Sequence, residues 1–457
     1  MEYNQILYRD GDMERLITRK PIDWKNSPKR KPLILRGVRQ CGKTWILREF
    51  GKEEFEDTAY LSFENNKPLY YCFETDMNPE HIVSELGKYR GKAIIPGKTL
   101  VIFDEIQFCP KALTSLKYFC EELPELHIVC AGSYLGLHLS KSAGSFPVGK
   151  VDFLTLHPMN FAEYLLANND ADLYQELKEL TPADRVSAPF QFRLETRYKE
   201  YLITGGMPEA VKTWVDTQDT TETDRVLRSI LDSYESDFLK YAPNDVLPKL
   251  TLIWKSIPEQ LAKDNHKFIF SHVKTGLKSR DLEDALYWLV SAGIVIQVSK
   301  IEKPGIPLSI YTDTTNFKIY LCDTGLLRML SQFPAAGITS VSPVTADMRG
   351  ALAENFVLTE LLSQNDVLPS FWKDGAAEVE FIYQKELAII PIEVKYGRNT
   401  ASKSLASYRM QHHPEFSIRT SLKNISADVD EYGCKLQIPL YLLWNLDNLL
   451  ECCMKNE

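Results

Sequence analysis

The chain has 457 residues, enough for two or three domains, and 44% of them are hydrophobic, which predicts packed cores. The formal net charge of −9 argues against a protein that coats nucleic acid through bulk charge, although a local basic groove stays compatible with it. No apolar run approaches the roughly 18 residues of a spanning helix, and the nine cysteines form no C-x-x-C pair, so we expect no membrane span and a cytoplasmic location.

The first 160 residues alternate apolar segments with amphipathic ones. We predict strands at 32–36, 59–63, 100–104 and 127–131, with helices between them. That alternation is typical of an α/β domain, in which right-handed crossovers build a parallel sheet with helices on both faces. Residues 1–160 are therefore expected to form one such domain.

The segment between the first predicted strand and the next helix reads GVRQCGKT and fits G-x-x-x-x-G-K-[ST]. The glycines let consecutive N–H groups turn inward on a phosphate, and the helix adds its positive amino end. Lys43 would reach the β- and γ-phosphates, and the Thr44 hydroxyl would coordinate Mg²⁺. The alternative is a Gly-rich turn with a surface lysine. We predict an ATP and Mg²⁺ site in this P-loop, with the nucleotide held by Gly37, Val38, Arg39, Gln40, Cys41, Gly42, Lys43, Thr44 and Trp45.

Two later strands end in residues that fit the same chemistry. Residues 99–105 form an apolar run that ends in Asp104 and Glu105, as a Walker B element requires. Asp104 would hold Mg²⁺ and Glu105 would polarise the attacking water. Ser133 follows the strand at 127–131 and is a candidate sensor of the γ-phosphate, the alternative being an ordinary helix cap. Lys43, Glu105 and Ser133 are thus the predicted catalytic residues.

The middle of the chain is mainly helical. Residues 161–245 are predicted as a helical region that a Gly-Gly turn interrupts at 205–206. Residues 246–345 follow a helix, helix, strand order that suggests a winged-helix module, in which Lys274, Lys278 and Arg280 could contact phosphates. A module that only packs against the first domain is the alternative.

Residues 346–457 carry a second group of acids. Glu354 lies in a predicted helix, Glu380 in an alternating strand, and Glu393 and Lys395 in a strand that reads Glu-Val-Lys. If these elements converge, the carboxylates could bind a second Mg²⁺ and the lysine could position a water, as in PD-(D/E)xK nucleases. The alternative is a pair of solvated charges on an edge strand.

The order of these motifs resembles a large prokaryotic family of AAA-type ATP-binding proteins with a nuclease-like C-terminal domain. The resemblance rests on the P-loop, on Glu354, on the Glu-Val-Lys strand and on the segments 103–107, 131–133, 157–161, 205–209 and 318–327. It implies an ATPase core, a helical or winged-helix middle and a small α/β restriction-endonuclease-like C-terminal domain.

The chain departs from that family at two places. The family commonly has Asp where this chain has Glu380, and the extra methylene puts nucleic-acid cleavage in doubt because Mg²⁺ tolerates little displacement. A Gly-Arg commonly precedes the segment at 157–161, whereas this chain has Gly149-Lys150. Lysine lacks the bidentate fork of arginine, so Arg193 or Arg197 could sense phosphate instead.

These observations predict a Mg²⁺-dependent ATP-binding protein, an ATPase whose nucleotide state regulates the C-terminal nuclease-like domain. One alternative is an ATP-gated, metal-dependent nuclease that acts on DNA or RNA. Another is a switch that holds ATP without turnover and binds a nucleic-acid or protein partner. The sequence leaves open whether the chain forms homo-oligomers.

Overall fold

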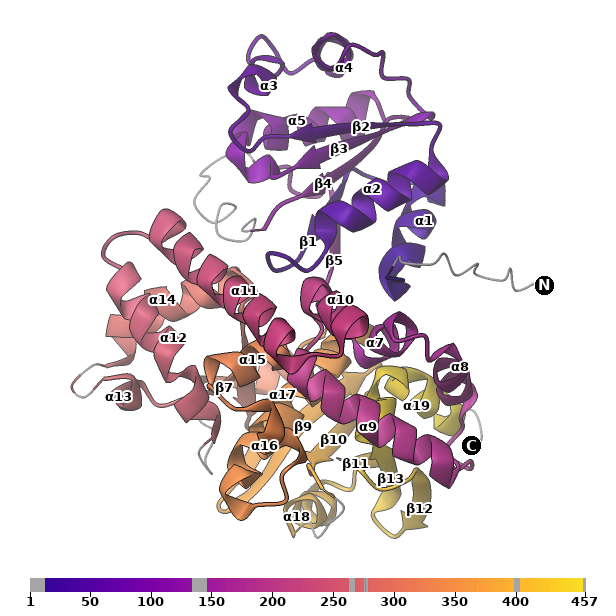
Figure 1. The fold of residues 1–457 in the computed structure, drawn as a ribbon, viewed down its shortest axis with the longest axis vertical. Coiled ribbons are helices and arrows are strands. Elements are labelled where there is room, and N and C mark those ends of the chain that lie inside the picture. Colours follow the sequence, from indigo (N-terminus) through magenta and orange to yellow (C-terminus); the bar gives the residue numbers. More distant parts are fainter. Residues whose placement is uncertain are drawn as a thin grey trace.

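The computed structural model describes residues 13–133, 146–262, 268–274, 276, 278–365, 367–397 and 403–454. An N-terminal α/β domain and a C-terminal domain built on a second sheet lie at opposite ends of the molecule, with helices between them (Figure 1). Within the described residues, no helix combines the length and the apolar character needed to cross a membrane.

The N-terminal domain contains a five-stranded sheet with the order β2-β3-β4-β1-β5, in which every pair is parallel. The strands are β1 (Leu33–Arg36), β2 (Asp57–Ser62), β3 (Thr99–Asp104), β4 (His127–Ala131) and β5 (Asp152–Thr155). The parallel P-loop fold and four of its strands are confirmed. The sequence analysis missed β5, because this edge strand is only partly buried and lacks a continuous apolar run.

The period of two in β1 explains why helices cover both faces of this sheet. Leu33 and Leu35 pack into one core together with residues of α1 and α2, whereas Ile34 packs into a second core with residues of α4 and α5. The helices of this domain are α1 (Arg19–Asn26), α2 (Lys43–Glu54), α3 (Lys67–Tyr71), α4 (Pro79–Arg90) and α5 (Pro110–Glu122).

A helical region follows the first sheet, and its members α10 and α11 lie between the two ends of the molecule (Figure 1). Its first helix begins with a capping box, in which Asn160 and Glu163 satisfy each other's backbone amides. The region comprises α7 (Phe161–Ala167), α8 (Ala171–Glu179), α9 (Ala188–Thr204), α10 (Pro208–Thr217), α11 (Thr220–Tyr241), α12 (Leu247–Ala262), α13 (Phe270–Val273) and α14 (Ser279–Ser291).

The C-terminal sheet is mixed and has the order β12-β13-β11-β10-β9-β8-β6-β7. Its strands are β6 (Val295–Ile301), β7 (Thr312–Leu321), β8 (Ser370–Asp374), β9 (Ala377–Lys385), β10 (Ala388–Val394), β11 (Phe416–Ser421), β12 (Ser426–Asp430) and β13 (Gly433–Pro439). The accompanying helices are α15 (Thr324–Leu330), α16 (Ala335–Thr339), α17 (Ala346–Gln364), α18 (Lys403–His412) and α19 (Leu446–Met454).

The hairpin of β6 and β7 comes from the segment that was predicted as a winged-helix module. It does not stand apart, because β6 pairs in parallel with β8 and so extends the C-terminal sheet across the predicted boundary at residue 345. The domain boundaries derived from the sequence therefore stay predictions, and the strands of 246–345 belong to the C-terminal sheet.

Candidate functional site

The P-loop joins the end of β1 at Arg36 to the start of α2 at Lys43. Gly37 has φ of 154° and Gly42 has φ of 97°, both in the range that side chains resist. A Cβ at Gly37 would lie only 2.4 Å from the carbonyl oxygen of Leu156, so glycine is required there by space as well. The loop therefore has the strand, turn and helix context that a phosphate cradle needs.

Lys43 is 6% exposed and folds back over the loop. Its Nζ donates to the carbonyl oxygens of Gly37, at 2.9 Å, and Val38, at 2.8 Å. Within the described part of the chain, no carboxylate forms an ion pair with this ammonium. A buried positive charge that only carbonyl dipoles balance favours the arrival of an anion.

Side chains from other regions of the chain donate hydrogen bonds to carbonyl groups of the P-loop. The Cys41 carbonyl accepts a hydrogen bond from Arg15 Nη1 at 3.0 Å, and the Arg39 carbonyl accepts one from the Tyr234 hydroxyl at 2.9 Å. The Arg39 guanidinium also pairs with Asp237, whose side chain is 4% exposed. The shape of the loop thus depends on the N-terminal segment and on α11, where Tyr234 and Asp237 lie.

The end of β3 brings Asp104 to the first turn of α2. Asp104 Oδ2 accepts hydrogen bonds from Thr44 Oγ1 at 3.0 Å and from the Tyr60 hydroxyl at 2.5 Å, while Oδ1 accepts from the Glu105 amide. Burial and the Asp104 carboxylate raise the pKa of Tyr60 to about 12, so the phenol keeps its proton and donates. The hydroxyl and carboxylate oxygens of Thr44 and Asp104 are the hard ligands that Mg²⁺ prefers.

Glu105 lies just beyond Asp104, with a positive φ of 51° that is uncommon for a residue with a side chain. Gln107 Nε2 donates to Glu105 Oε2, and Ser133 Oγ donates to Glu105 Oε1 at 3.4 Å. The strand order places β4 between β1 and β3, which is why Ser133 reaches Glu105. Trp45 follows Thr44 on α2, and 39% of its surface is exposed. The sequence analysis assigned no role to four residues whose side chains contact this site: Arg15, Tyr60, Gln107 and Tyr234.

The arginines that were considered as phosphate sensors are engaged elsewhere. Arg193 and Arg197 lie on α9 and pair with Asp170 at 2.7 and 2.5 Å. Lys150 pairs with Glu121 at 2.8 Å on the surface of the first domain. These contacts place all three cations in local ion pairs.

The structure brings together the four residues of the predicted C-terminal site. Lys395 Nζ lies 2.7 Å from Glu393 Oε1, and the Val394 amide donates to Glu380 Oε2 at 3.1 Å. Burial, and then the charges of Glu393 and Glu354, raise the pKa of Glu380 to about 8. Among the described residues, however, no group of three or more His, Cys, Asp or Glu side chains is arranged to hold a metal ion.

A buried lysine that the sequence analysis did not assign lies in the same cluster. Lys318, on β7, is 0% exposed, and its Nζ lies 2.6 Å from Glu378 Oε1 and 4.0 Å from Glu354 Oε2. Burial alone would lower the pKa of this ammonium, but the carboxylates of Glu354, Glu378 and Glu380 raise it above its ordinary value. The available signal was a lysine directly before an apolar run, Ile319-Tyr320-Leu321.

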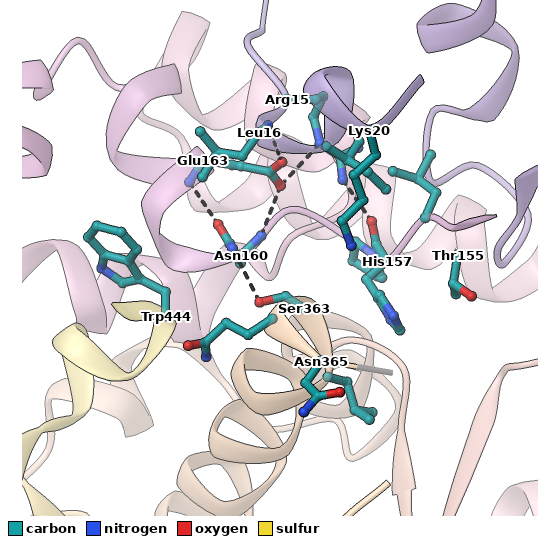
Figure 2. A pocket seen from close by; sticks show the side chains of 15 residues that line it. Arg15, Leu16, Lys20, Thr155, His157, Asn160, Glu163, Ser363, Asn365 and Trp444 are labelled. Atoms are coloured by element: carbon teal, nitrogen blue, oxygen red, sulfur yellow. Dashed lines mark hydrogen bonds and ion pairs between the residues drawn. The ribbon is translucent and has the colours of Figure 1, made fainter. Parts of the chain in front are cut away.

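Residues of the N-terminal segment, α7 and α17 meet between the two domains, at a joint formed by Arg15, Asn160, Glu163, Glu360 and Ser363. A hollow of about 300 Å³ lies beside this joint. Figure 2 shows a chain of contacts there: Arg15 pairs with Glu163 at 3.1 Å, Glu163 and Asn160 cap α7, and Asn160 donates to Ser363 at 3.2 Å. Ser363 and Glu360 lie near the end of α17, and Glu360 accepts from the Phe161 amide at 2.9 Å. The joint thus links a side chain that touches the P-loop to the helix that carries Glu354.

The two-glycine turn completes this joint. The Gly206 amide donates to Asp323 Oδ2 at 2.6 Å, and the Met159 amide donates to the Gly206 carbonyl at 2.7 Å. A Cβ on Gly206 would lie 2.0 Å from the Met159 carbonyl oxygen, so the backbones approach too closely for any side chain. Segments 157–161, 205–209 and 318–327 therefore pack against one another.

Three family models match consecutive parts of the chain. The model described as "AAA domain" matches residues 29–165, "Domain of unknown function (DUF8612)" matches 195–337, and "Domain of unknown function (DUF4143)" matches 349–442. The first match spans the P-loop, β3 and Ser133, and it agrees with the sheet described above, so the N-terminal domain has the fold of an AAA-type P-loop ATPase. None of the curated proteins compared with the chain matches it.

Solved structures of low sequence identity were also found. The Walker-type ATPase PABY2304 of Pyrococcus abyssi is 15% identical, with 70% of this chain and 97% of that chain covered at a TM-score of 0.45. The ORC2 protein of Aeropyrum pernix, in ADPNP–ADP complexes, is 13% identical, with coverages of 73% and 98% and a TM-score of 0.35. AMPPCP-bound DnaA of Aquifex aeolicus is 12% identical, with coverages of 61% and 86% and a TM-score of 0.27.

Proposed function

We propose that the chain binds and hydrolyses ATP with Mg²⁺, and that its nucleotide state regulates the C-terminal domain. The observation that carries this proposal is the buried ammonium of Lys43, at the start of α2, whose hydrogen-bond partners among the described residues are the carbonyl oxygens of Gly37 and Val38. A phosphate group would replace those weak partners with a full negative charge, and the amino end of α2 would add to the attraction.

The residues around the loop divide the work of hydrolysis. Loop amides and Lys43 bind the phosphates, and Thr44 and Asp104 would hold Mg²⁺, which supplies charge neutralisation on the transferred phosphoryl group. Glu105 accepts the proton of the attacking water, and Ser133 and Gln107 hold its carboxylate in place. The Tyr60 hydroxyl orients Asp104.

Coupling to the rest of the molecule follows from the outer contacts of the P-loop. Arg15 contacts both the Cys41 carbonyl and Glu163 on α7. Asn160, which caps α7, contacts Ser363 on α17. Because Lys43 must leave its carbonyl partners to bind phosphate, the loop and these contacts adjust together. We propose that α17 transmits this adjustment to the C-terminal domain. The C-terminal domain or the helical region would then recognise a binding partner, which is DNA, RNA or protein.

Phosphate release by the Glu105→Gln variant tests the proposal. We expect turnover to fall by about 10² to 10⁴ while ATP binding stays close to that of the parent, because the amide cannot accept the proton of water. Glu53→Gln, an exposed glutamate on α2, is the matched control and should turn over like the parent.

A parent protein that binds ATP without releasing phosphate would instead be a switch without turnover. The same assay, repeated with single-stranded and duplex nucleic acids, separates partner classes, since a partner that engages the C-terminal domain should change the rate. Equal turnover by the parent and Glu105→Gln would contradict the assignment of the base.

A further inference from the structure

The acidic cluster of the C-terminal domain already contains cations. Four carboxyl groups meet there, those of Glu354, Glu378, Glu380 and Glu393, and three lysines pair with them or lie close to them: Lys318, Lys373 and Lys395. The central one is Lys318, the only one of the three that is fully buried, and it lies between the glutamate of α17 and that of β9.

We infer that the Lys318 ammonium is the resident cation of this cluster and takes the place of a divalent metal, so that the C-terminal domain neither binds Mg²⁺ at Glu354, Glu380 and Glu393 nor cleaves nucleic acid there. This inference goes beyond the proposed ATPase and does not depend on nucleotide.

Each glutamate of the cluster has at least one carboxyl oxygen engaged with a nitrogen or hydroxyl donor. Glu378 pairs with Lys318 and Lys373, each at 2.6 Å. Glu354 Oε2 accepts from the Tyr320 hydroxyl at 3.1 Å. Glu393 Oε1 pairs with Lys395, which leaves its Oε2 as a buried oxygen with no hydrogen-bond partner among the described residues. A metal ion would have to compete with these donors for the oxygens of the near-octahedral set that Mg²⁺ demands.

Burial limits water, the other source of metal ligands. Mg²⁺ dehydrates reluctantly and usually keeps several waters. Lys318 is 0% exposed, Glu393 2% and Glu354 7%, whereas Glu380 is partly exposed, so few waters reach the side of the cluster that Lys318, Glu354 and Glu393 form. A divalent ion would also lie close to the Lys318 ammonium, and that repulsion would cancel much of its attraction to the carboxylates.

The cluster instead serves to fix the position of α17. Its members come from different elements: Glu354 from α17, Lys318 from β7, Lys373 from β8 and Glu378 from β9. A lysine with carboxylate partners on two neighbouring elements holds the helix in one register on the sheet. The carboxyl-terminal part of the same helix carries Glu360 and Ser363 at the joint, so a fixed α17 can pass a movement of the joint to the sheet.

A manganese titration of the full chain, without nucleotide, tests the inference. The probe is MnCl₂, and the fraction of free Mn²⁺ is followed by electron paramagnetic resonance. We expect the parent, Glu393→Gln and Glu354→Gln to bind the same number of Mn²⁺ ions per chain, because these glutamates hold none. A parent that binds one Mn²⁺ more than both variants, or Mn²⁺-dependent nicking of plasmid that Glu393→Gln abolishes, overturns the inference.

Removal of the lysine gives the converse test. Lys318→Met should bind one Mn²⁺ more than the parent, and this gain should disappear in the Lys318→Met, Glu393→Gln double variant. A folded Lys318→Met protein that gains no ion overturns the role assigned to Lys318. If that variant does not fold, the comparison of the parent with Glu393→Gln and Glu354→Gln decides the question alone.

Discussion

The two ends of the molecule each bury a lysine, and the partners of these lysines differ in kind. Lys43 is 6% exposed and contacts two carbonyl oxygens, which balance its charge only partly. Lys318 is 0% exposed and lies 2.6 Å from a carboxylate, with a second carboxylate 4.0 Å away. The first lysine still needs an anion, whereas the second already has one. Residue type alone thus says less about a site than the charge of the neighbours.

The largest effect in this comparison is expected from Lys318→Met. Loss of the buried ammonium leaves the carboxylates of Glu378 and Glu354 without their shared counter-ion, and such a loss typically costs about 3–5 kcal/mol of unfolding free energy. Lys373 is the other partner of Glu378, and its side chain is 32% exposed. Lys373→Met should therefore cost about 1 kcal/mol or less. Urea unfolding followed by circular dichroism measures both. Equal losses in the two variants would contradict the central place of Lys318.

The buried carboxyl group of Glu360 sharpens the contrast. Among the described residues it forms no ion pair and accepts a hydrogen bond from the Phe161 amide. Burial raises the pKa of Glu360 to about 8, so the folded chain holds a proton there that the unfolded chain releases above its ordinary pKa of 4.5. The contribution to stability is complete below pH 4.5 and is lost as pH rises towards 8, with a slope on the order of 1 kcal/mol per pH unit.

Glu360→Gln should remove that part of the pH dependence, since the amide stays neutral and still accepts from the Phe161 amide. The measurement is the free energy of unfolding between pH 5 and pH 8, with Glu122→Gln, an exposed glutamate at the end of α5, as the control. Parent and Glu360→Gln profiles that run parallel across this range would show that Glu360 is ionised in the folded chain.

A smaller effect is expected from Tyr60→Phe. The lost hydroxyl orients Asp104, and the loss of such a supporting contact typically lowers metal affinity by about 10- to 100-fold. We expect the Mg²⁺ concentration for half-maximal ATP turnover to rise, while turnover at saturating Mg²⁺ changes little. Tyr89→Phe, which removes an exposed hydroxyl on α4, serves as the control. An unchanged Mg²⁺ requirement would show that Tyr60 does not orient Asp104 for Mg²⁺ binding.

The residues of the proposed nucleotide site could be selected from the sequence because their chemistry is local. The residues from Gly37 to Thr44 are contiguous, and Asp104 and Ser133 end strands whose parallel order brings them to one edge of the sheet. What the sequence could not supply are contacts across long separations, such as Arg15 to the Cys41 carbonyl and Tyr234 to the Arg39 carbonyl. These depend on how α11 and the N-terminal segment pack.

The C-terminal cluster illustrates the same limit. The convergence of Glu354, Glu380 and Glu393 followed from a helix and two strands whose alternation is visible in the sequence. The presence of Lys318 among them did not, because β7 is not adjacent to β9 in the sheet order, and the contact of Lys318 with Glu378 is visible only in the folded chain. From the sequence alone, a lysine in a strand is expected to lie on the surface.

Calorimetric titration of Mg·ATP into the parent and into Lys43→Ala tests the central claim most directly, with Lys52→Ala, an exposed lysine of the same helix, as the control. A charge-assisted contact of this kind is worth about 1.5–3 kcal/mol, which is roughly a 10- to 150-fold loss of affinity in Lys43→Ala. The parent and Lys52→Ala should bind one ATP per chain with equal affinity. A Lys43→Ala protein that binds Mg·ATP as tightly as the parent would contradict the account.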